Sequence, residues 1–598
     1  MSRCLHDCVA AGIPAVFLWL MARLPPSYIW DKESCPRGVA VMRNLWPNLW
    51  RWWSIGVHRW RKRWLVTLAG LAAIGGAGAG LWSWHLGTPP DPDQKLVMWL
   101  GDEPAPLDPG STGDQWAMDL LGAVEEGLMR QGKGATLDPG LAERVEVSPD
   151  HTRFVFHLRL AAWSDGVPLR AEDFRYAWLR VLDPATHSPW ARLLYPVQGA
   201  KAYAEGKGPA GQVAVKALGD RILEVKTTRP TPYFPSLTAE PALYPVRKDV
   251  VEKYGKEFGT GPGKMVFIGP FRISSWERDR QVTLANNPTY WDARHVHLTS
   301  VTFKIVKELG QRISLYETGG LDQTGVAGSW LDQWKGKPDP VAVPEDSVFF
   351  LVFNPERYPS FANKNIRLAL SYALDRRDYV RRLWSGAAEP AYGLVPPSIP
   401  GRTKSFRQEN GDLFVDNRPD AARALLRNGL QELHLNALPP LTFLSDNSAP
   451  SVAAAKWLQD QWKTKLGIDV RIDEVPAAER LHRQRTGDYQ VAVAGWGADY
   501  NDASAFLKLW VSDFPDNLVH YHNPDYDRLI AAAEASTDPA GRAGELEQAE
   551  RILFQDMPVA PLFFRERVWL QKPFVKHIVY PSVGLDWDLK GAYVEKRP

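Results

Sequence analysis

The chain has 598 residues, with 71 Lys and Arg against 69 Asp and Glu, and 45% of its residues are hydrophobic. This length favours at least two domain-sized cores, and the balanced composition excludes an intrinsically disordered chain, a collagen-like repeat and a polytopic membrane protein. Because the charges are evenly mixed and the net charge is only +2, we expect no nucleic acid as a partner.

The first 90 residues differ in charge from the rest of the chain. They hold 10 Lys and Arg against 3 Asp and Glu, whereas the other 508 residues hold 61 against 66. Residues 64–84 contain no charge over 21 positions, which is about 30 Å of helix, and they directly follow the basic residues Arg61, Lys62 and Arg63. This pattern predicts a basic, Trp-rich cytoplasmic leader over residues 1–63 and a transmembrane helix over residues 64–84, with the remainder of the chain outside.

The leader leaves alternatives open. The Ala-Gly-Ala sequence at positions 77–79 also fits a signal-peptidase site, so residues 64–84 are either a retained anchor, which we favour, or a cleaved signal. A shorter apolar run, Val9–Ala22, is interrupted by Pro14 and is too short to span a bilayer. If translation starts at Met42, residues 1–41 are not part of the protein.

The body of the chain begins with a strand pattern followed by a helix pattern. Thr152–Arg159 alternates between two sets of side chains, which is the period of a half-buried strand. In the segment that follows, Phe174, Ala177, Trp178 and Val181 recur at helical spacing, and two acidic residues lie in the first turn. The sequence therefore predicts an amphipathic helix there.

The same order of elements recurs in the second half. Ser347–Phe353 is continuously apolar and predicts a buried strand, and a helix with Ile366 and Leu370 on its apolar face follows. Further along, Gln490–Val493 predicts a short strand, and after a polar turn a helical run extends over Ala505–Trp510. Both halves therefore mix strands and helices, which is typical of an α/β fold.

We find no sequence signature of an enzyme. The motifs HExxH, GxSxG and GK[ST] are absent, and all three cysteines lie within the first 35 residues. His295 and His297, like His520 and His522, could each supply two metal ligands, but such pairs arise by chance among 13 histidines. We expect no catalytic residue, no metal and no cofactor.

A series of short motifs runs along the body in one order. They are GDEPAPLDP (Gly101–Pro109), EEGL (Glu125–Leu128), LAERVEVSPDHTRFVFHLR (Leu141–Arg159), WSDGVPLRAEDF (Trp163–Phe174), TPYF (Thr231–Phe234), GPFRISSW (Gly269–Trp276), NPTYWD (Asn287–Asp292), IRLALSYALDR (Ile366–Arg376), LGIDV (Leu466–Val470), GWGADYNDASAFL (Gly495–Leu507) and APLFF (Ala560–Phe564). With this set, the sequence from about Lys95 to Lys576 resembles the peptide-binding proteins of bacterial ABC importers, the extracytoplasmic solute-binding proteins of family 5.

The resemblance implies an α/β fold of defined organisation. It is a two-lobed periplasmic-binding-protein clamshell of class II type with an additional domain, which traps its ligand when the lobes close. We expect lobe 1 to comprise residues 92–125, 246–340 and 567–598, the additional domain residues 126–245, and lobe 2 residues 341–566. The transmembrane or signal helix would precede this body.

The resemblance also implies a ligand site. In the family, the aspartate at the position of Asp499 pairs with the α-ammonium of the peptide, and a carboxylate about 4 Å from an ammonium gains roughly 4 kcal/mol at an effective dielectric constant near 20. Taken alone, Asp499 and Asn501 also fit Asx-type turns, and Trp496 could fill the core instead of contacting the ligand. The expected ligand-binding residues are Asp499, Trp496, Gly495, Gly497, Tyr500, Asn501, Thr112, Gly113 and Asp114.

The function implied is capture of short peptides and their delivery to the permease subunits of an ABC importer. We expect a monomer in the periplasm or on the outer face of the cytoplasmic membrane, anchored by residues 64–84. Val493 departs from the family, because some members have an arginine there that can meet a ligand carboxylate. Alternatives are a membrane-tethered peptide sensor and a binding protein for a cell-wall peptide or a metal chelate, whereas a peptidase lacks its motifs.

Overall fold

The computed structural model describes residues 89–133, 136–515 and 517–597. The predicted leader, residues 1–63, and the predicted membrane or signal helix, residues 64–84, lie outside the described residues. Pro90–Pro598 forms one compact unit. Within the described ranges, no helix combines the length and the apolar character needed to cross a membrane.

Two hydrophobic cores organise this unit. The first core gathers buried side chains from Leu96 to Val343 and again from Val568 to Val594, with Ala387 added from the intervening segment. The second core gathers side chains from Val348 to Phe564. The fold is therefore a mixed α/β arrangement of two lobes, in which the first core is built from both ends of the unit.

Two four-stranded sheets support the first core. One has the order β1-β10-β9-β8, in which β1 and β10 are parallel and the other neighbours are antiparallel. The other has the order β4-β5-β7-β6 and is antiparallel throughout. Their strands are β1 (Lys95–Leu100), β8 (Phe271–Glu277), β9 (Gln281–Asn286), β10 (Ser300–Ile305), β4 (Ala142–Val147), β5 (Arg153–Leu158), β6 (Val215–Ala217) and β7 (Ile222–Lys226).

The first predicted strand and helix are confirmed. The alternating segment forms β5, and the amphipathic segment forms α6 (Ala171–Leu182), which buries Phe174, Trp178 and Val181. The indole Nε1 of Trp178 donates a hydrogen bond of 2.8 Å to the Leu243 carbonyl, so the largest side chain of the helix is both packed and satisfied.

The second core is built on a seven-stranded sheet. Its order is β11-β17-β12-β16-β14-β15, with β13 added on β17. The strands are β11 (Gln323–Val326), β12 (Pro340–Phe353), β13 (Ala388–Pro390), β14 (Leu441–Asp446), β15 (Val470–Val475), β16 (Val491–Gly497) and β17 (Val559–Gln571). The two remaining pairs are β2 (Met129–Gln131) with β3 (Leu137–Pro139), and β18 (Val575–Lys576) with β19 (Tyr593–Val594).

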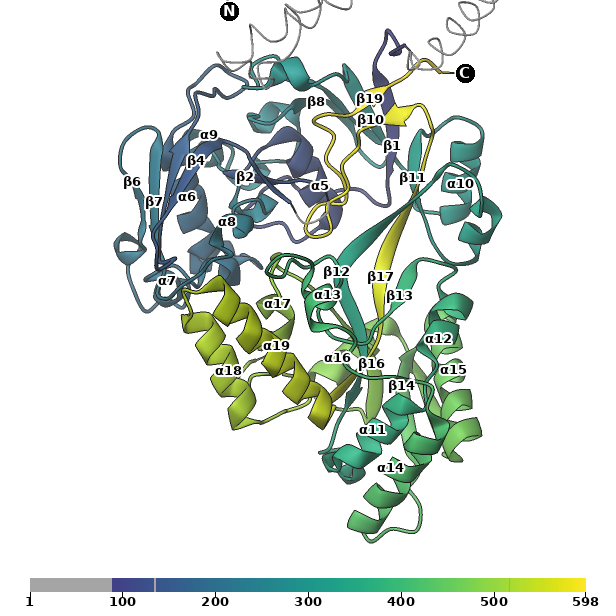
Figure 1. Ribbon diagram of the computed structural model, residues 1–598. Coiled ribbons are helices and arrows are strands. Elements are labelled where there is room, and N and C mark those ends of the chain that lie inside the picture. Colours follow the sequence, from purple (N-terminus) through teal and green to yellow (C-terminus); the bar gives the residue numbers. More distant parts are fainter. Residues whose placement is uncertain (1–88, 134–135, 516, 598) are drawn as a thin grey trace, which may run out of the picture. The chain divides into compact units, whose positions relative to one another are not determined.

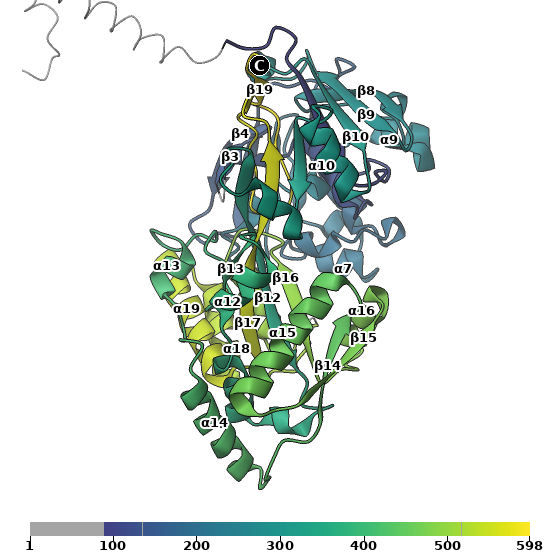
Figure 2. The same ribbon diagram turned by 90° about the vertical axis from the view of Figure 1, so that its right-hand side faces the viewer.

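Strands β12 and β17 run from one core to the other (Figures 1 and 2). Val343 of β12 belongs to the first core and Val348 to the second, and the register between the two strands shifts between Pro344 and Val348. The predicted strand Ser347–Phe353 is confirmed, but it is only the buried half of β12. This antiparallel pair is the covalent and hydrogen-bonded connection between the cores.

Helices flank the seven-stranded sheet on both sides, with α12 and α15 on the right in Figure 1 and α18 and α19 on the left. Because both faces are covered there, the parts of β12 and β17 that lie in the second core are apolar, Val348–Phe353 and Val559–Phe564. The helices of this part are α11 (Lys364–Tyr372), α12 (Arg376–Leu383), α13 (Phe406–Asn410), α14 (Pro419–Glu432), α15 (Ala449–Leu466), α16 (Ala477–Arg485), α17 (Ser504–Leu507), α18 (Pro524–Ala535) and α19 (Pro539–Asp556).

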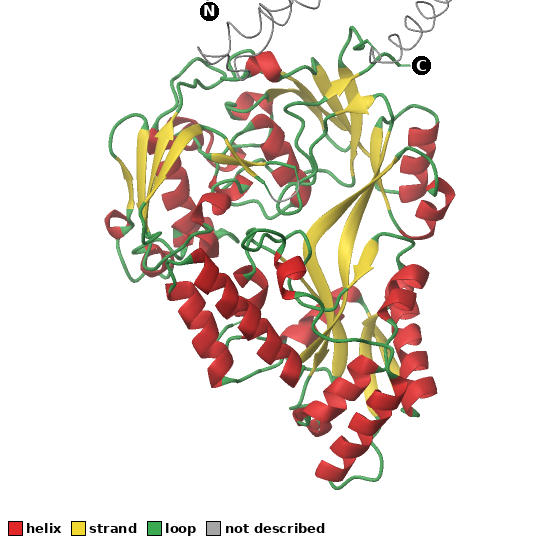
Figure 3. Ribbon diagram, in the orientation of Figure 1, coloured by secondary structure: helices red, strands yellow, loops and turns green. Residues whose placement is uncertain are grey.

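The remaining helices belong to the first core or to its surface. The α-helices are α5 (Gln115–Val124), α7 (Ala200–Ala204), α8 (Phe234–Leu237), α9 (Lys248–Tyr254) and α10 (Leu309–Glu317). Short 3-10 helices are η1 (Pro184–Thr186), η2 (Ala191–Leu194), η3 (Ala210–Gln212), η4 (Pro241–Leu243), η5 (Gly255–Glu257), η6 (Pro262–Lys264), η7 (Ala293–His295), η8 (Gly328–Trp334), η9 (Pro359–Ala362) and η10 (Lys508–Trp510). The segment between β18 and β19 is mostly loop (Figure 3).

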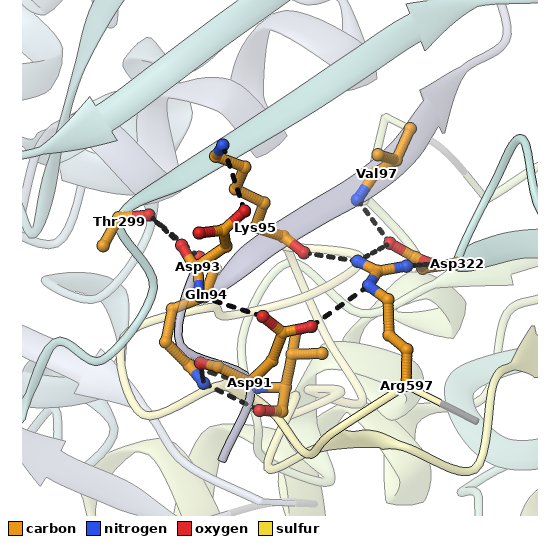
Figure 4. Close-up of polar contacts among 9 residues, drawn as sticks. Asp91, Asp93, Gln94, Lys95, Val97, Thr299, Asp322 and Arg597 are labelled. Carbon is orange, nitrogen blue, oxygen red and sulfur yellow. Dashed lines mark hydrogen bonds and ion pairs between the residues drawn. The ribbon is translucent and has the colours of Figure 1, made fainter.

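The two ends of the described unit are bound to each other (Figure 4). The guanidinium of Arg597 lies 2.7 Å from Asp322 and 3.5 Å from Asp91, and it donates a hydrogen bond of 2.6 Å to the Lys95 carbonyl. Asp322 also accepts a hydrogen bond of 2.9 Å from the backbone N–H of Val97. The start of β1 is therefore fixed by a residue about 500 positions away.

Candidate ligand-binding site

A cavity of about 690 Å³ lies between elements of the two cores. This volume is within the range of about 300–1,000 Å³ usual for sites that bind small molecules. The lining residues from the first lobe are Trp99, Trp116, Trp190, Glu240, Arg312, Trp569 and the loop residues Ser582, Val583, Gly584 and Asp586. Those from the second lobe are Trp384, Gly497, Ala498 and Asp499. The strands β12 and β17 add Glu345, Asp346 and Arg565. Closing such a cavity around a ligand would bury the ligand between the lobes.

The end of β16 carries the predicted motif to the cavity wall. Gly497 pairs with Ser347 of β12, and the next backbone N–H, that of Ala498, donates a hydrogen bond of 2.8 Å to the Asp346 carbonyl. Gly497, Ala498 and Asp499 line the cavity, and a Cβ at Gly497 would meet no atom within 4 Å. The end of the strand therefore places the acidic side chain of Asp499 close to the open backbone of Gly497.

Gly495 has a different environment. A Cβ there would lie 2.6 Å from Cε1 of Phe349, whose ring is stacked on Phe563 at a centroid distance of 4.7 Å. Because Gly495 has no side chain, the ring of Phe349 can lie directly against the backbone of β16. Trp496 packs against the second core and donates a hydrogen bond of 2.9 Å from Nε1 to the Ala505 carbonyl.

Tyr500 and Asn501 lie beside the main cavity, in the wall of a smaller one that also includes Gln131 and Glu240. The ring of Tyr500 is stacked on that of Tyr233 at a centroid distance of 4.2 Å and an interplanar angle of 12°. Because Tyr500 packs against both cores, this stack is a direct contact between the two lobes.

Thr112, Gly113 and Asp114 are not among the residues that line either cavity. Asp114 caps α5 by accepting a hydrogen bond of 2.9 Å from the Ala117 N–H, and the Thr112 carbonyl accepts one of 2.7 Å from Nε1 of Trp190. Thr112 and Asp114 therefore support Trp190 and α5, which do line the cavity, whereas Gly113 is exposed.

Glu240 is an acidic residue of the site that the sequence did not reveal. Its side chain lines the cavity although the residue is only 7% exposed, and it accepts a hydrogen bond of 2.7 Å from Nε2 of Gln131. Burial, followed by the nearby charge of Asp499, raises the pKa of Glu240 to about 8. Two carboxyl groups from different lobes therefore face the same space.

Most other charges of the cavity are matched within the protein. Arg565 forms a bidentate pair with Glu345 at 2.7 and 2.5 Å, and Arg567 forms an ion pair with Asp586. Asp346 accepts hydrogen bonds from Ser398 and Ser582, and burial raises its pKa. The acidic residues that line the cavity outnumber the arginines, which favours a ligand that carries a positive group; the acidic residues are Glu240, Glu345, Asp346, Asp499, Glu566 and Asp586, and the arginines are Arg312, Arg565 and Arg567.

Five tryptophans line the cavity, and none of them is among the site residues predicted from the sequence. They come from positions as distant as Trp99 and Trp569. No local pattern distinguishes them from the other tryptophans, because they converge only through the fold. A tryptophan-rich wall suits ligands of mixed polarity.

The histidine pairs have ordinary surroundings. Nδ1 of His295 lies 2.6 Å from Asp292, and Nδ1 of His522 lies 2.7 Å from the Ser512 hydroxyl. Among the residues that the structure describes, no group of three or more His, Cys, Asp or Glu side chains is placed to hold a metal ion.

Comparison with known proteins gives one consistent family. Residues 136–517 match the family described as bacterial extracellular solute-binding proteins, family 5 Middle. The oligopeptide-binding protein OppA of Bacillus subtilis is 33% identical over 505 residues, which cover 82% of this chain and 91% of that protein.

Two solved structures extend the likeness to the fold. Listeria monocytogenes OppA bound to peptide matches with a TM-score of 0.68 and 30% identity, over 85% of this chain and all of that one. The unliganded open form of the periplasmic murein tripeptide binding protein MppA matches with a TM-score of 0.73 and 28% identity, over 86% of this chain and 99% of that one. The chain therefore belongs to the bacterial extracellular solute-binding proteins of family 5.

Proposed function

We propose that this protein captures short peptides in the cavity between its two lobes and delivers them to the permease subunits of an ABC importer. The observation that carries the proposal is the end of β16, where Asp499 and the backbone of Gly497 line a cavity that elements of both cores enclose. Relatives named as oligopeptide-binding and dipeptide-binding proteins support the same ligand class.

In this proposal Asp499 binds the α-ammonium of the peptide. Glu240 adds a second carboxyl group from the opposite lobe, and because burial raises its pKa to about 8, this group is largely protonated at neutral pH until a nearby positive charge favours its ionised form. The open backbone of Gly497 would form strand-like hydrogen bonds to the peptide main chain, which recognise peptides of any sequence. Trp496 and Tyr500 would then act on the lobes and not on the ligand, because they pack on the cores.

The finer organisation belongs to the same proposal. We assign residues 92–125, 246–340 and 567–598 to lobe 1, residues 126–245 to an additional domain and residues 341–566 to lobe 2, in a class II clamshell. Residues 64–84 would hold a monomeric protein at the outer face of the cytoplasmic membrane. The intact mass of the protein purified from membranes distinguishes a retained anchor from a cleaved signal.

The test is binding of free and N-acetylated peptides to the wild type and to Asp499→Asn. Removing one partner of a desolvated charge pair costs about 2–5 kcal/mol, so the variant should bind free peptides at least 30-fold more weakly. N-acetylation should weaken binding to the wild type by a similar factor and should leave binding to the variant unchanged.

Asp469→Asn is the matched control, because Asp469 is exposed and pairs with Lys463 on the surface of the second lobe. It should bind as the wild type does. Equal affinity of Asp499→Asn and the wild type for free peptides would refute the assignment of Asp499. Native mass spectrometry that finds a single non-peptide species bound to the protein would refute the peptide class itself.

A further inference from the structure

Arg312 differs from the other arginines that line the cavity. Arg565 and Arg567 each have a carboxylate partner in the wall, Glu345 and Asp586. Among the described residues, no carboxylate forms an ion pair with Arg312, and its buried Nε has no hydrogen-bond partner. A guanidinium remains charged at neutral pH, so the wall holds one positive charge that has no carboxylate partner and whose Nε–H donates to no group of the protein.

The guanidinium of Arg312 is held on an aromatic surface. Its Cζ lies 3.8 Å from the ring centroid of Trp99, which is cation-π distance. Trp99 is in turn packed edge to face against Trp116 at a centroid distance of 4.9 Å. All three side chains line the cavity.

Two glycines permit this arrangement. A Cβ at Gly101 would lie 2.6 Å from Cζ2 of Trp116, and a Cβ at Gly325 would lie 3.0 Å from Cζ2 of Trp99. The indoles are therefore closely enclosed by backbone, and the guanidinium rests on a fixed surface. A group fixed before binding loses little entropy when a ligand arrives.

The electrostatic surroundings agree with a site for an anion. Burial lowers the pKa of Arg312, and the charge of Glu308, just before α10, opposes that shift without forming an ion pair. The charged guanidinium of Arg312 is therefore partly removed from water, and only the charge of Glu308, which forms no ion pair with it, offsets the cost. A planar guanidinium in this state favours a carboxylate, which it can bind through two parallel hydrogen bonds.

We propose that Arg312, held on Trp99, binds a carboxylate of the peptide in the same cavity in which Asp499 binds its ammonium. This inference rests on the proposed function and deepens it. Arg312 would supply the positive charge that is missing at Val493, from the opposite lobe. The carboxylate is either the peptide C-terminus or an acidic side chain, and both present the same chemistry to the guanidinium.

The experiment is isothermal titration calorimetry of the full chain with two peptide series. The first is tri-, tetra- and penta-alanine, each as the free acid and as the C-terminal amide. The second compares Ala-Ala-Glu-amide with Ala-Ala-Gln-amide. Because hydrogen bonds to charged groups contribute about 1.5–3 kcal/mol, the wild type should prefer the carboxylate form about 10- to 100-fold in one series.

Arg312→Gln should abolish that preference, and Arg312→Lys should retain part of it, because lysine keeps the charge but not the planar fork. The matched control is Arg278→Gln. Arg278 also lies on a tryptophan, 4.0 Å above Trp276, but it pairs with Glu103 and does not line the cavity. This control should keep the preference of the wild type.

Each result decides the matter. A preference in the alanine series assigns the C-terminal carboxylate, and a preference for Glu over Gln assigns a side chain. Two results would overturn this inference while N-acetylation still weakens binding through Asp499. The first is a wild type that shows no preference for the carboxylate form in either series. The second is an Arg312→Gln variant that keeps the preference of the wild type. If the wild type binds no peptide in either series, the proposed function is refuted, and this inference is refuted with it.

Discussion

Two buried groups of charged residues in the first core, one around Arg130 and one in the cavity wall, differ in whether their charges are paired. Around Arg130, opposite charges are paired within the protein. The guanidinium lies 2.5 Å from Glu126 and forms an ion pair with Asp588. Glu126 also accepts hydrogen bonds of 2.7 Å from Tyr290 and 2.6 Å from Trp291. This network holds the EEGL segment against the loop that precedes β19.

Two groups of the cavity wall, by contrast, have no opposite charge beside them. Glu240 is bonded only to the neutral amide of Gln131 among the described side chains, and Arg312 rests on the neutral ring of Trp99. Uncompensated burial costs stability, and a fold tolerates it where a ligand supplies the missing charge. The comparison separates charged groups that are paired within the protein from groups that are not, to which our proposals give a role in ligand binding.

The largest expected effect comes from breaking the compensated network. Arg130→Met leaves Glu126 and Asp588 buried without a cation, so the free energy of unfolding should fall by about 3–5 kcal/mol. Urea denaturation measures this loss. The control Arg144→Met removes an exposed pair with Glu146 and should cost less than about 1 kcal/mol. Equal losses in the two variants would remove the distinction on which the comparison rests.

An intermediate effect should come from Glu240, and it should depend on pH. Its pKa is about 8 in the folded protein, above that of an exposed glutamate, so the folded state keeps a proton that the unfolded state has released. Stability from this group is therefore fully present below about pH 4.5 and is lost as the pH rises to about 8, at up to about 1.4 kcal/mol per pH unit.

Glu240→Gln removes this dependence, and the variant should gain about 2–4 kcal/mol relative to the wild type between pH 5 and pH 8. Unfolding free energies of both proteins across this range provide the measurement. Parallel pH profiles would mean that Glu240 is already ionised at pH 5 and is compensated like the residues around Arg130.

The smallest expected effect concerns the aromatic contact between the lobes. Tyr233→Leu removes the stack on Tyr500, which is worth about 1 kcal/mol, and should weaken peptide binding about fivefold by destabilising the arrangement of the two lobes. Tyr372→Leu is the control, because Tyr372 stacks on Phe414 within the second core. It should lower the melting temperature but leave the affinity unchanged, and the reverse pattern would show that the Tyr233 stack does not couple the lobes.

The sequence predicted regular elements well where one face or both faces of an element are apolar. The strand Thr152–Arg159 and the helix that follows it appear as β5 and α6, and the helix predicted around Ile366 appears as α11. The strands β12 and β16, which extend beyond the second core, are longer than the sequence predicts. The first half of β12 contains Pro340 and Pro344, and β16 ends in glycines, so neither end carries the apolar signal of a buried strand.

The candidate site was predictable only in part. The motif around Asp499 is continuous in sequence, and its position at the cavity follows from the end of one strand. Glu240 and Arg312 come from a loop before η4 and from α10, and no local pattern marks either as different from a surface charge. Their significance depends on long-range packing, which one sequence does not display.

The bond between the two ends of the unit determines when each core can form. All buried side chains of the second core come from one continuous stretch, Val348 to Phe564, whereas β1 is fixed by contacts such as the 2.7 Å hydrogen bond from Gln94 to the Val594 carbonyl, 500 positions later. At a synthesis rate of about 5–20 residues per second, those 500 residues take roughly 25–100 s to make. The two four-stranded sheets of the first core can pair once Ile305 has been made, but this core receives its last buried side chains, Val568 to Val594, only after every residue of the second core has been made. The lobe that begins first is therefore completed last.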